Sequence, residues 1–298
     1  MDIEFRQLRC FVAVVDEGTF TDAGISLGIS QTAVSRNLAV LEEHLGVRLI
    51  HRTTRSVSLT EAGERAVAHA RRVLAAVVGL ERAVEGGGRL RLGYTWSALG
   101  RHTSELQRRW AAECPDTELE LVMDNSPTAG LLEGACDVAI LRRVPAAGLA
   151  VRQLELRRIG AEKRYCAMAA DDPLAGRRSV GLAQIADKPL AVDVRTGSTT
   201  LELWPAESRP AKTFEIHSVD DWLTLISSGR ARGVTAEATA HQYRRRGLVY
   251  RPVRDAPPVP VHAAWVKGGL PAVGRKLIGL LEELYSSGEN GERQHGDG

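Results

Sequence analysis

The sequence contains neither a long uninterrupted apolar run nor a recognisable leader. No stretch approaches the ~18 apolar residues of a membrane span, and the N-terminus starts with acidic and polar residues instead of an apolar signal region. We therefore expect a cytoplasmic protein without a membrane partner. A chain of 298 residues is long enough for two domains or three.

Signatures of catalysis and of metal binding are also missing. The chain has no G-x-S-x-G, H-E-x-x-H or Walker motif, and no G-x-G-x-x-G after a predicted strand. Its four cysteines show no C-x-x-C pairing and no metal-ligand spacing, a pattern typical of reduced cytoplasmic thiols. We expect no enzymatic activity, no cofactor and no bound metal.

Charge of one sign does not dominate the N-terminal part of the chain. Residues 1–60 carry six Arg and seven Asp or Glu, a net charge of −1, although the whole chain is at +2. The distribution is more informative, because residues 44–60 hold three Arg and no acidic residue. Such a segment can form a local basic patch on a neutral domain.

The first 30 residues predict two helices and a tight turn. Apolar residues at three- and four-residue steps favour a helix over residues 3–16 that ends at Gly18. Thr21 is placed to cap a short second helix. Gly28 then makes the turn, and Ser30 can cap a third helix through its side-chain oxygen.

This third helix, over residues 31–45, has two distinct faces. Its apolar stripe is formed by Val34, Leu38, Leu41 and Leu45. The polar side chains of its first turn and a half belong to Gln31, Thr32, Ser35 and Arg36. A recognition helix presents such residues to base edges in the major groove. Taken alone, the pattern is equally compatible with the solvated face of any small helical bundle.

The next segment favours DNA binding. Residues 47–59 alternate apolar and polar side chains, which suits a two-stranded wing with cations and hydroxyl groups facing phosphate. The wing residues expected to contact phosphate are Arg52, Thr53, Thr54 and Arg55.

Residues 1–63 resemble the winged helix-turn-helix of LysR-type transcriptional regulators. The motifs that carry this resemblance are residues 33–36 (Ala-Val-Ser-Arg), Leu41-Glu42, Leu45-Gly46, Leu49-Ile50, Arg52 and residues 59–63 (Leu-Thr-Glu-Ala-Gly). Thr32 departs from the family pattern, in which a smaller residue or Pro is common. This departure bears on sequence preference, not on DNA binding itself.

Residues 60–85 predict one long helix with a heptad seam. The seam consists of Ala66, Ala70, Val73, Val77, Leu80 and Val84. Packing against its own domain is one way to bury this seam. We favour a dimeric coiled coil, which would set two DNA-reading units about 34 Å apart. Gly86, Gly87 and Gly88 then break the helix and form a hinge.

From residue 89 the pattern changes to strands that alternate with helices, which is typical of a parallel sheet. The first set comprises strands at 90–94, 119–123 and 137–141, with helices at 99–112 and through Leu131 and Leu132. The second set comprises strands at 165–169, 190–194, 214–219 and 233–235, followed by a strand at 261–266 and a helix at 277–284. The region resembles the family's effector domain, which implies a two-lobed fold of the type 2 periplasmic-binding-protein kind.

Candidate effector-binding residues follow from strand ends, because ligands of open parallel sheets bind beyond the carboxyl ends of strands. They are Thr95, Trp96, Ser97, Asp124, Ser126, Thr128, Arg195, Thr196, Ser198 and Trp222. Helix capping is at least as good an explanation for several of the hydroxyl residues. The cleft would suit a small polar or carboxylated molecule with an aromatic or apolar part. Asp124 argues against a purely anionic ligand, and could pair with a cation or with Arg195.

The predicted fold class is therefore multi-domain α+β. The expected parts are a winged helix-turn-helix at 1–60, a dimerising linker helix and hinge at 61–88, a two-lobed α/β effector-binding domain at 89–285 (lobe I at about 89–158 and 260–285, lobe II at about 159–259) and a disordered tail at 286–298.

We predict a sequence-specific DNA-binding transcriptional regulator whose activity a small-molecule effector modulates. Its expected partners are double-stranded DNA with a roughly palindromic site, the effector, a second copy of the chain and RNA polymerase, and the resemblance implies a tetramer. The alternative is a small-molecule-binding protein or an enzyme with an accessory helical domain. The missing leader and missing catalytic motifs disfavour it.

Overall fold

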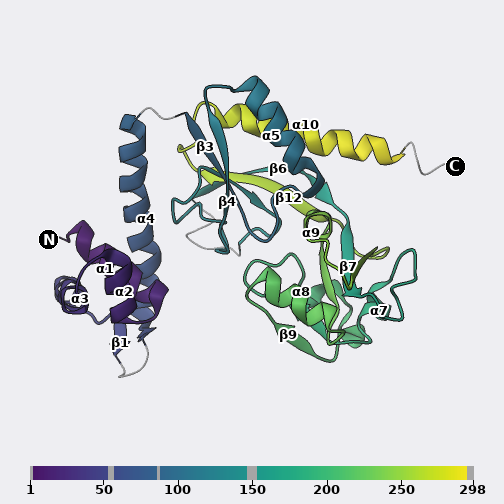
Figure 1. Ribbon diagram of the computed structural model, residues 1–298, viewed down its shortest axis with the longest axis horizontal. Coiled ribbons are helices and arrows are strands. Elements are labelled where there is room, and N and C mark those ends of the chain that lie inside the picture. Colours follow the sequence, from purple (N-terminus) through teal and green to yellow (C-terminus); the bar gives the residue numbers. More distant parts are fainter. Residues whose placement is uncertain (1–2, 53–56, 86–87, 146–152, 294–298) are drawn as a thin grey trace. The chain divides into compact units, whose positions relative to one another are not determined.

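The computed structural model describes residues 3–52, 57–85, 88–145 and 153–293 (Figure 1). The chain divides into two compact units. Unit 1 comprises residues 1–87 together with residues 132–134, and unit 2 comprises residues 88–131 and 135–298. No described helix is long and apolar enough to cross a membrane.

Unit 1 opens with three helices, α1 (Phe5–Glu17), α2 (Phe20–Leu27) and α3 (Gln31–Leu45). Gly18 and Gly28 end the first two in the left-handed backbone conformation, which glycine adopts without strain. The Ser30 hydroxyl accepts a hydrogen bond from the Ala33 N–H, which confirms the predicted cap of α3. The predicted cap at Thr21 is wrong. Thr19 caps α2, because α2 begins at Phe20 and the Asp22 N–H reaches the Thr19 hydroxyl.

The apolar stripe of α3 faces the core of unit 1. Val34, Leu38 and Leu41 are buried against side chains of α1. Burial of a Val or Leu side chain contributes about 1.5–3 kcal/mol relative to exposure. The last member of the predicted stripe, Leu45, is instead 39% exposed.

A two-stranded antiparallel wing follows α3. Its strands are β1 (Ile50–Arg52) and β2 (Val57–Leu59), with Ile50 opposite Leu59. The buried carboxylate of Glu42 on α3 accepts the N–H groups of Leu49 at 2.8 Å and Ile50 at 3.2 Å. These hydrogen bonds fix the wing to the C-terminal end of α3.

The long helix α4 (Glu61–Glu85) carries the predicted heptad seam, whose residues differ in burial. Ala66 and Ala70 pack into the core of their own unit, whereas Val73 is 48% exposed. The first part of the seam is therefore already covered within the chain. Ala66, Ala70 and Val73 nevertheless line one apolar groove, so the dimer seam stays a prediction.

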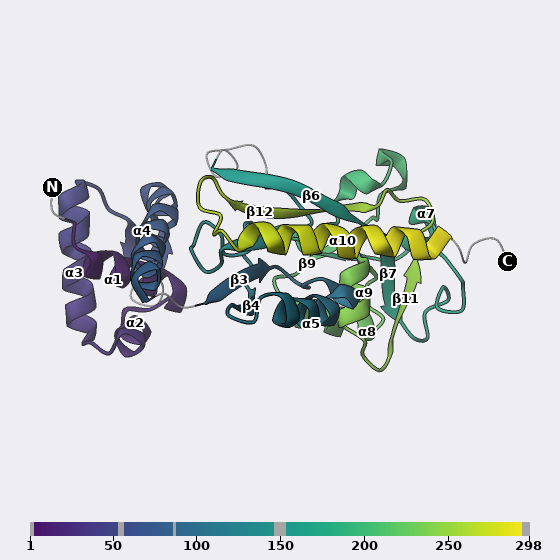
Figure 2. The same ribbon diagram turned by 90° about the horizontal axis from the view of Figure 1, so that it is seen from above.

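Lobe I of unit 2 is a five-stranded sheet with the order β4-β3-β5-β12-β6. The pairs β3–β4 and β3–β5 are parallel, whereas β12 pairs antiparallel with both β5 and β6. The helices α5 and α10 cover one face of this sheet (Figure 2). The strands are β3 (Arg89–Tyr94), β4 (Glu118–Met123), β5 (Val138–Leu141), β6 (Leu154–Glu162) and β12 (Val259–Val266), and the helices are η1 (Gly100–His102), α5 (Thr103–Glu113) and α10 (Gly274–Arg293).

Lobe II contains an antiparallel sheet with the order β10-β7-β11 and a parallel pair, β8–β9. The prediction of a second all-parallel set is thus wrong, because β10 and β11 both run antiparallel to β7. Its elements are β7 (Arg164–Ala169), α7 (Leu182–Ile185), β8 (Leu190–Val192), η2 (Leu201–Leu203), η3 (Ala206–Ser208), β9 (Thr213–Glu215), α8 (Val219–Ser227), β10 (Gly233–Ala236), α9 (Glu237–Gln242) and β11 (Leu248–Pro252).

Three further boundaries differ from the sequence analysis. The predicted lobe boundary at residue 158 falls inside β6, which stays in the lobe I sheet to Glu162. No helix passes through Leu131, because Ala129 and Gly130 have φ values of 51° and 84°, which end a right-handed helix. The predicted disorder of the tail is wrong for residues 286–293, which continue α10. There the hydroxyls of Ser286 and Ser287 donate to carbonyls four residues earlier.

Candidate functional site

The first turn and a half of α3 presents the predicted DNA-reading residues on the surface of unit 1. Gln31, Thr32 and Arg36 are exposed, and Ser35 is half-buried. Arg52 ends β1 opposite Val57, at the end of the strand that leads into the wing loop. The other three predicted wing residues, Thr53, Thr54 and Arg55, lie outside the described residues.

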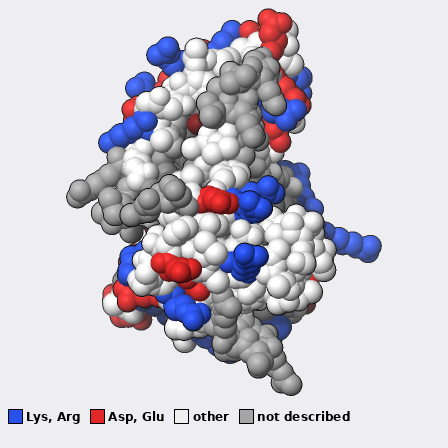
Figure 3. Space-filling model, turned by 90° about the vertical axis from the view of Figure 1, so that its left-hand side faces the viewer, with Lys and Arg blue, Asp and Glu red and all other residues white. Residues whose placement is uncertain are grey.

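No strong single-sign patch is visible on the face of the molecule shown in Figure 3. Basic and acidic side chains are scattered there among a largely uncharged surface. This pattern agrees with the net charge of −1 for residues 1–60.

A narrow cleft lies between the two lobes of unit 2. Its cavity has a volume of about 30 Å³, which is the share of liquid volume of one water molecule. The lobes are therefore closed on each other. Six of the ten predicted effector-binding residues line this cleft, and these are Thr95, Trp96, Ser97, Thr196, Ser198 and Trp222.

The other four predicted residues do not line it. The Asp124 carboxylate accepts the Ser126 N–H, and the Ser126 hydroxyl accepts the Gly130 N–H, so both stabilise the turn after β4. Thr128 is buried in that turn, and the side chain of Arg195 is exposed. The contacts of these four residues are those of local turns. A structural role of this kind was the alternative to effector binding.

Asp193, which was not among the predicted effector-binding residues, carries one of the polar contacts between the lobes. Its buried carboxylate accepts the indole N–H of Trp96 at 2.7 Å and the Thr196 hydroxyl at 2.5 Å. Trp96 follows β3 in lobe I, whereas Asp193 follows β8 in lobe II. The two lobes are tied further by the Tyr243 hydroxyl, which donates to the Trp96 carbonyl at 2.6 Å.

Beside this cleft, a buried ion pair joins Arg142 and Glu162. The guanidinium donates to both carboxylate oxygens, at 3.0 and 2.8 Å, and also to the carbonyls of Ser97 and Ala98. Burial raises the pKa of Glu162. The attraction of Arg142 and the hydrogen bonds from Arg142, Tyr285 and Ala238 outweigh this effect and hold the pKa below its usual value.

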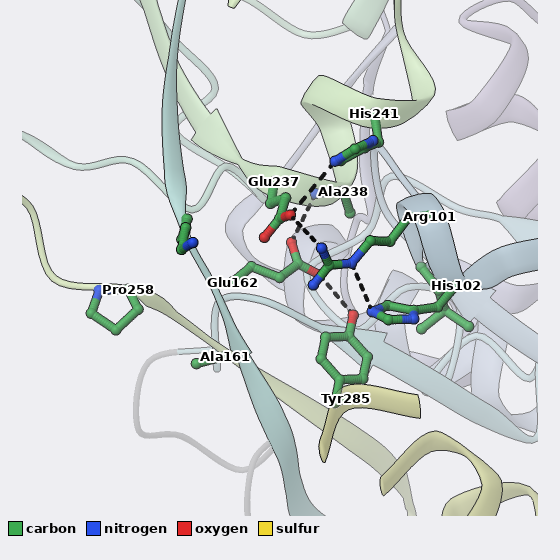
Figure 4. A pocket seen from close by; sticks show the side chains of 11 residues that line it. Arg101, His102, Ala161, Glu162, Glu237, Ala238, His241, Pro258 and Tyr285 are labelled. Carbon is green, nitrogen blue, oxygen red and sulfur yellow. Dashed lines mark hydrogen bonds and ion pairs between the residues drawn. The ribbon is translucent and has the colours of Figure 1, made fainter. Parts of the chain in front are cut away.

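The same carboxylate borders a second cavity of about 190 Å³ at the crossings between the lobes (Figure 4). In the close-up, the Tyr285 hydroxyl points to Glu162, and Arg101 lies between Glu237 and His102. His241 pairs with Glu237 from the other side. This polar network holds the starts of η1 and α9 together. No group of residues in the described part of the chain could hold a metal ion.

Two family models match this chain and together cover most of it. The bacterial regulatory helix-turn-helix of the LysR family matches residues 5–64, and the LysR substrate binding domain matches residues 84–286. The chain belongs to the LysR family. It is accordingly a DNA-binding transcriptional regulator and not an enzyme.

Individual LysR-family proteins agree with this assignment. The uncharacterised regulator YnfL of Escherichia coli is 36% identical over 63% of this chain and 65% of its own length. The regulator ShiR of Corynebacterium glutamicum is 29% identical over 95% of this chain and 99% of its own. The crystal structure of the LysR regulator CbnR, at 23% identity, covers 95% of this chain and 99% of its own with a TM-score of 0.65, which supports the fold.

The cysteines of this LysR-family chain are expected to react slowly in the native state. Burial raises the pKa of Cys10, of Cys136 and, to about 12, of Cys166. At neutral pH a pKa of 12 leaves only about one thiol in 10⁵ as the reactive thiolate.

Cys114 is the half-buried exception. We expect Ellman's reagent to modify at most Cys114 rapidly, and all four thiols after unfolding in urea. Rapid modification of any thiol in a folded Cys114→Ser variant would contradict this expectation.

Proposed function

We propose that α3 reads base edges in the major groove and that the wing holds the flanking phosphates. Gln31, Thr32, Ser35 and Arg36 are assigned to the bases, and Arg52, Thr53, Thr54 and Arg55 to the phosphates. The supporting observation is that Thr32 and Arg36 lie opposite the buried stripe of α3 and that Gln31 and Ser35 lie on its flank, all in the first turns of the helix.

We expect Arg36→Ala to remove sequence discrimination. Loss of a bidentate contact with guanine costs about 1–3 kcal/mol, or roughly 5- to 150-fold in affinity for the specific site. Gel-shift titration on the intergenic DNA upstream of the chain's own gene, against a scrambled duplex, measures this loss.

Arg6→Ala is the matched control, because Arg6 is an exposed arginine of α1 paired with Glu4. Arg52→Ala should weaken both duplexes equally and flatten the salt dependence. Equal losses of discrimination from Arg36→Ala and Arg52→Ala would overturn the assigned roles.

We propose further that unit 1 dimerises through the first half of α4, from Ala62 to Val73. An apolar groove of about 500 Å³ lies beside this helix, and it includes the exposed side chains of Leu45, Val47 and Val73. A second copy of the chain would cover it and would pair two reading helices over a roughly palindromic site. Pairing of the effector domains would then give a tetramer.

Val73→Glu tests this dimer, since a charge in the groove loses its water on association. We expect sedimentation velocity to show dissociation at concentrations where the wild type stays associated. Ala39→Glu, an exposed change on α3 outside the groove, is the control and should leave the mass unchanged. A Val73→Glu variant that stays fully associated contradicts the proposed interface.

We propose that the effector binds between the lobes of unit 2. The observation that carries this proposal is the cleft itself, whose closure depends on a few side-chain hydrogen bonds between lobe I and lobe II. An effector that binds one lobe arrangement better than another shifts the balance between them. The regulator would act in the cytoplasm, on its DNA site and through RNA polymerase.

A thermal-shift screen of small metabolites on the full-length protein tests this proposal. A ligand that binds only the folded state raises the melting temperature. The stabilisation should be lost when Ser97, whose hydroxyl lies 3.0 Å from that of Thr239 across the cleft, is replaced by the larger Leu. Stabilisation that survives in a folded Ser97→Leu variant would place the ligand elsewhere.

A further inference from the structure

The only cationic side chain among the described residues that line the interlobe cavity is already neutralised. Arg142 forms a buried ion pair with Glu162, and two of its three remaining N–H groups donate to the carbonyls of Ser97 and Ala98. A ligand carboxylate entering this cavity would therefore find no available cation. Removal of a carboxylate from water without a compensating partner is strongly unfavourable.

Asp193, in contrast to Arg142, carries a charge that is not paired with an opposite charge among the described lining residues. Its residue is 4% exposed, and it is the single acidic lining residue among those described. Its carboxylate accepts hydrogen bonds from Trp96, from the Thr196 hydroxyl and from two backbone N–H groups of its own loop. None of these donors carries a charge. The cavity therefore contains a negative charge that no cation among its described lining residues balances.

The basic residues at the rim of the cavity do not neutralise the charge of Asp193. Arg143 donates to the Val194 carbonyl and lies close enough to Glu202 to lower the pKa of that carboxyl, after the larger effect of hydrogen bonds. Arg195 contributes only its backbone N–H to Asp193, and its own side chain is exposed. Neither arginine lines the cavity.

Two indole rings stand beside this carboxylate. Trp96 and Trp222 form an edge-to-face pair with ring centroids 5.5 Å apart and an interplanar angle of 78°. Trp222 is held in place by its N–H bond to the Ala191 carbonyl and by close packing over Gly233, where no Cβ would fit. The N–H edge of Trp96 meets Asp193 in this arrangement, so an indole face, which is itself negative and attracts cations, becomes available beside the carboxylate when Trp96 leaves it.

We propose that the cleft binds a small organic cation, an aliphatic or arylalkyl amine in its protonated form. This inference rests on the proposed effector site and names its ligand class. The ammonium group takes the acceptor on Asp193 that now receives the Trp96 indole N–H, and it packs against the indole rings. Since the closed cavity has room for about one water molecule, the rest of the ligand enters only as Trp96 leaves Asp193. Binding thereby breaks a contact that ties lobe I to lobe II.

A charge series within each of two ligand sets, one arylalkyl and one aliphatic, tests this proposal. Full-length protein is titrated by calorimetry with 2-phenylethylamine, 2-phenylethanol and 3-phenylpropanoate, and with butylamine, butanol and butanoate, at fixed ionic strength. We expect each amine to bind at least tenfold more tightly than the matched alcohol and carboxylate. In Asp193→Asn, which keeps the shape and loses the charge, the advantage of the amine over the alcohol should disappear. Asp124→Asn, in the turn outside the cavity, should retain it.

The outcomes distinguish an error in the ligand class from an error in the proposed effector site. Tighter binding of a carboxylate than of its amine overturns the inference, yet leaves the cleft as an effector site. An amine preference that persists in Asp193→Asn also overturns it. If Asp193→Asn does not fold, the wild-type series decides, and amines that bind no better than alcohols refute the proposal. Retention of specific DNA binding in every case shows that the regulator itself is intact.

Discussion

Glu162→Ala is expected to lower the free energy of unfolding of unit 2 by about 3–5 kcal/mol, because it leaves the buried Arg142 guanidinium without its counter-charge. The Tyr285 hydroxyl and the Ala238 N–H lose their acceptor in the same step. All five tryptophans of the chain lie at or beyond position 96. Tryptophan fluorescence during urea unfolding therefore reports on unit 2 and measures this change.

The matched control is Glu283→Ala, which removes an ion pair with Arg109 that is largely exposed to water. Such pairs contribute about 0–1 kcal/mol, so the control should barely shift the urea midpoint. Equal shifts from the two variants would contradict a special role for the buried pair.

The stability contributed by Glu162 also depends on pH. Its pKa is held below the usual value in the folded protein, so the unfolded chain binds the proton more tightly. The contribution is complete above the unfolded pKa of about 4.3 and is lost as the pH falls through the lower folded value. We expect wild-type unit 2 to lose stability more steeply than Glu162→Ala below pH 4.5.

Glu42→Ala is expected to destabilise unit 1 by about 2–6 kcal/mol. The change leaves the Leu49 and Ile50 N–H groups buried without their acceptor, at about 1–3 kcal/mol for each group. It also frees the wing from the end of α3. Helical circular dichroism should show an earlier unfolding step, while the tryptophan transition of unit 2 stays where it was.

Glu43→Ala is the matched control, since the neighbouring Glu43 is exposed. We expect its unfolding and its DNA binding to match the wild type. Specific DNA binding should weaken in Glu42→Ala in proportion to the unfolded fraction. A Glu42→Ala variant with unchanged stability would show that water replaces the carboxylate and would contradict the expectation.

The sequence was most informative where one local pattern decides the structure. The periodic stripe of α3 and the capping hydroxyl of Ser30 depend on nearby residues in the chain, and both were predicted correctly except for Leu45 at the end of the stripe. The strands β6 and β11 were missed, because neither alternates buried and exposed residues in the way of a half-buried strand. The positive φ at Ala129 could not be foreseen either, since alanine rarely adopts it.

Whether a cleft residue was predicted correctly depended on where the predicted strands end. The predicted strand at residues 190–194 included Asp193. The observed strand β8 ends at Val192, so Asp193 is the first residue beyond it. The strand-end rule would have selected Asp193 with the correct boundary. The rule also selected Asp124 and Ser126, whose hydrogen bonds close a turn instead. Only contacts between the lobes distinguish these cases, and a single sequence does not contain them.

The path of the chain through the two lobes has a consequence for the order in which they are completed during synthesis. All strands of lobe II lie between residues 164 and 252, whereas β12 of lobe I does not begin until Val259. This last strand inserts between β5 and β6. A growing chain therefore finishes lobe II before β12 has been made. Until then the facing edges of β5 and β6 in the lobe I sheet stay unpaired, and unpaired strand edges are prone to mispairing. Premature termination shortly before Val259 would release a protein with one complete lobe and an aggregation-prone half-sheet.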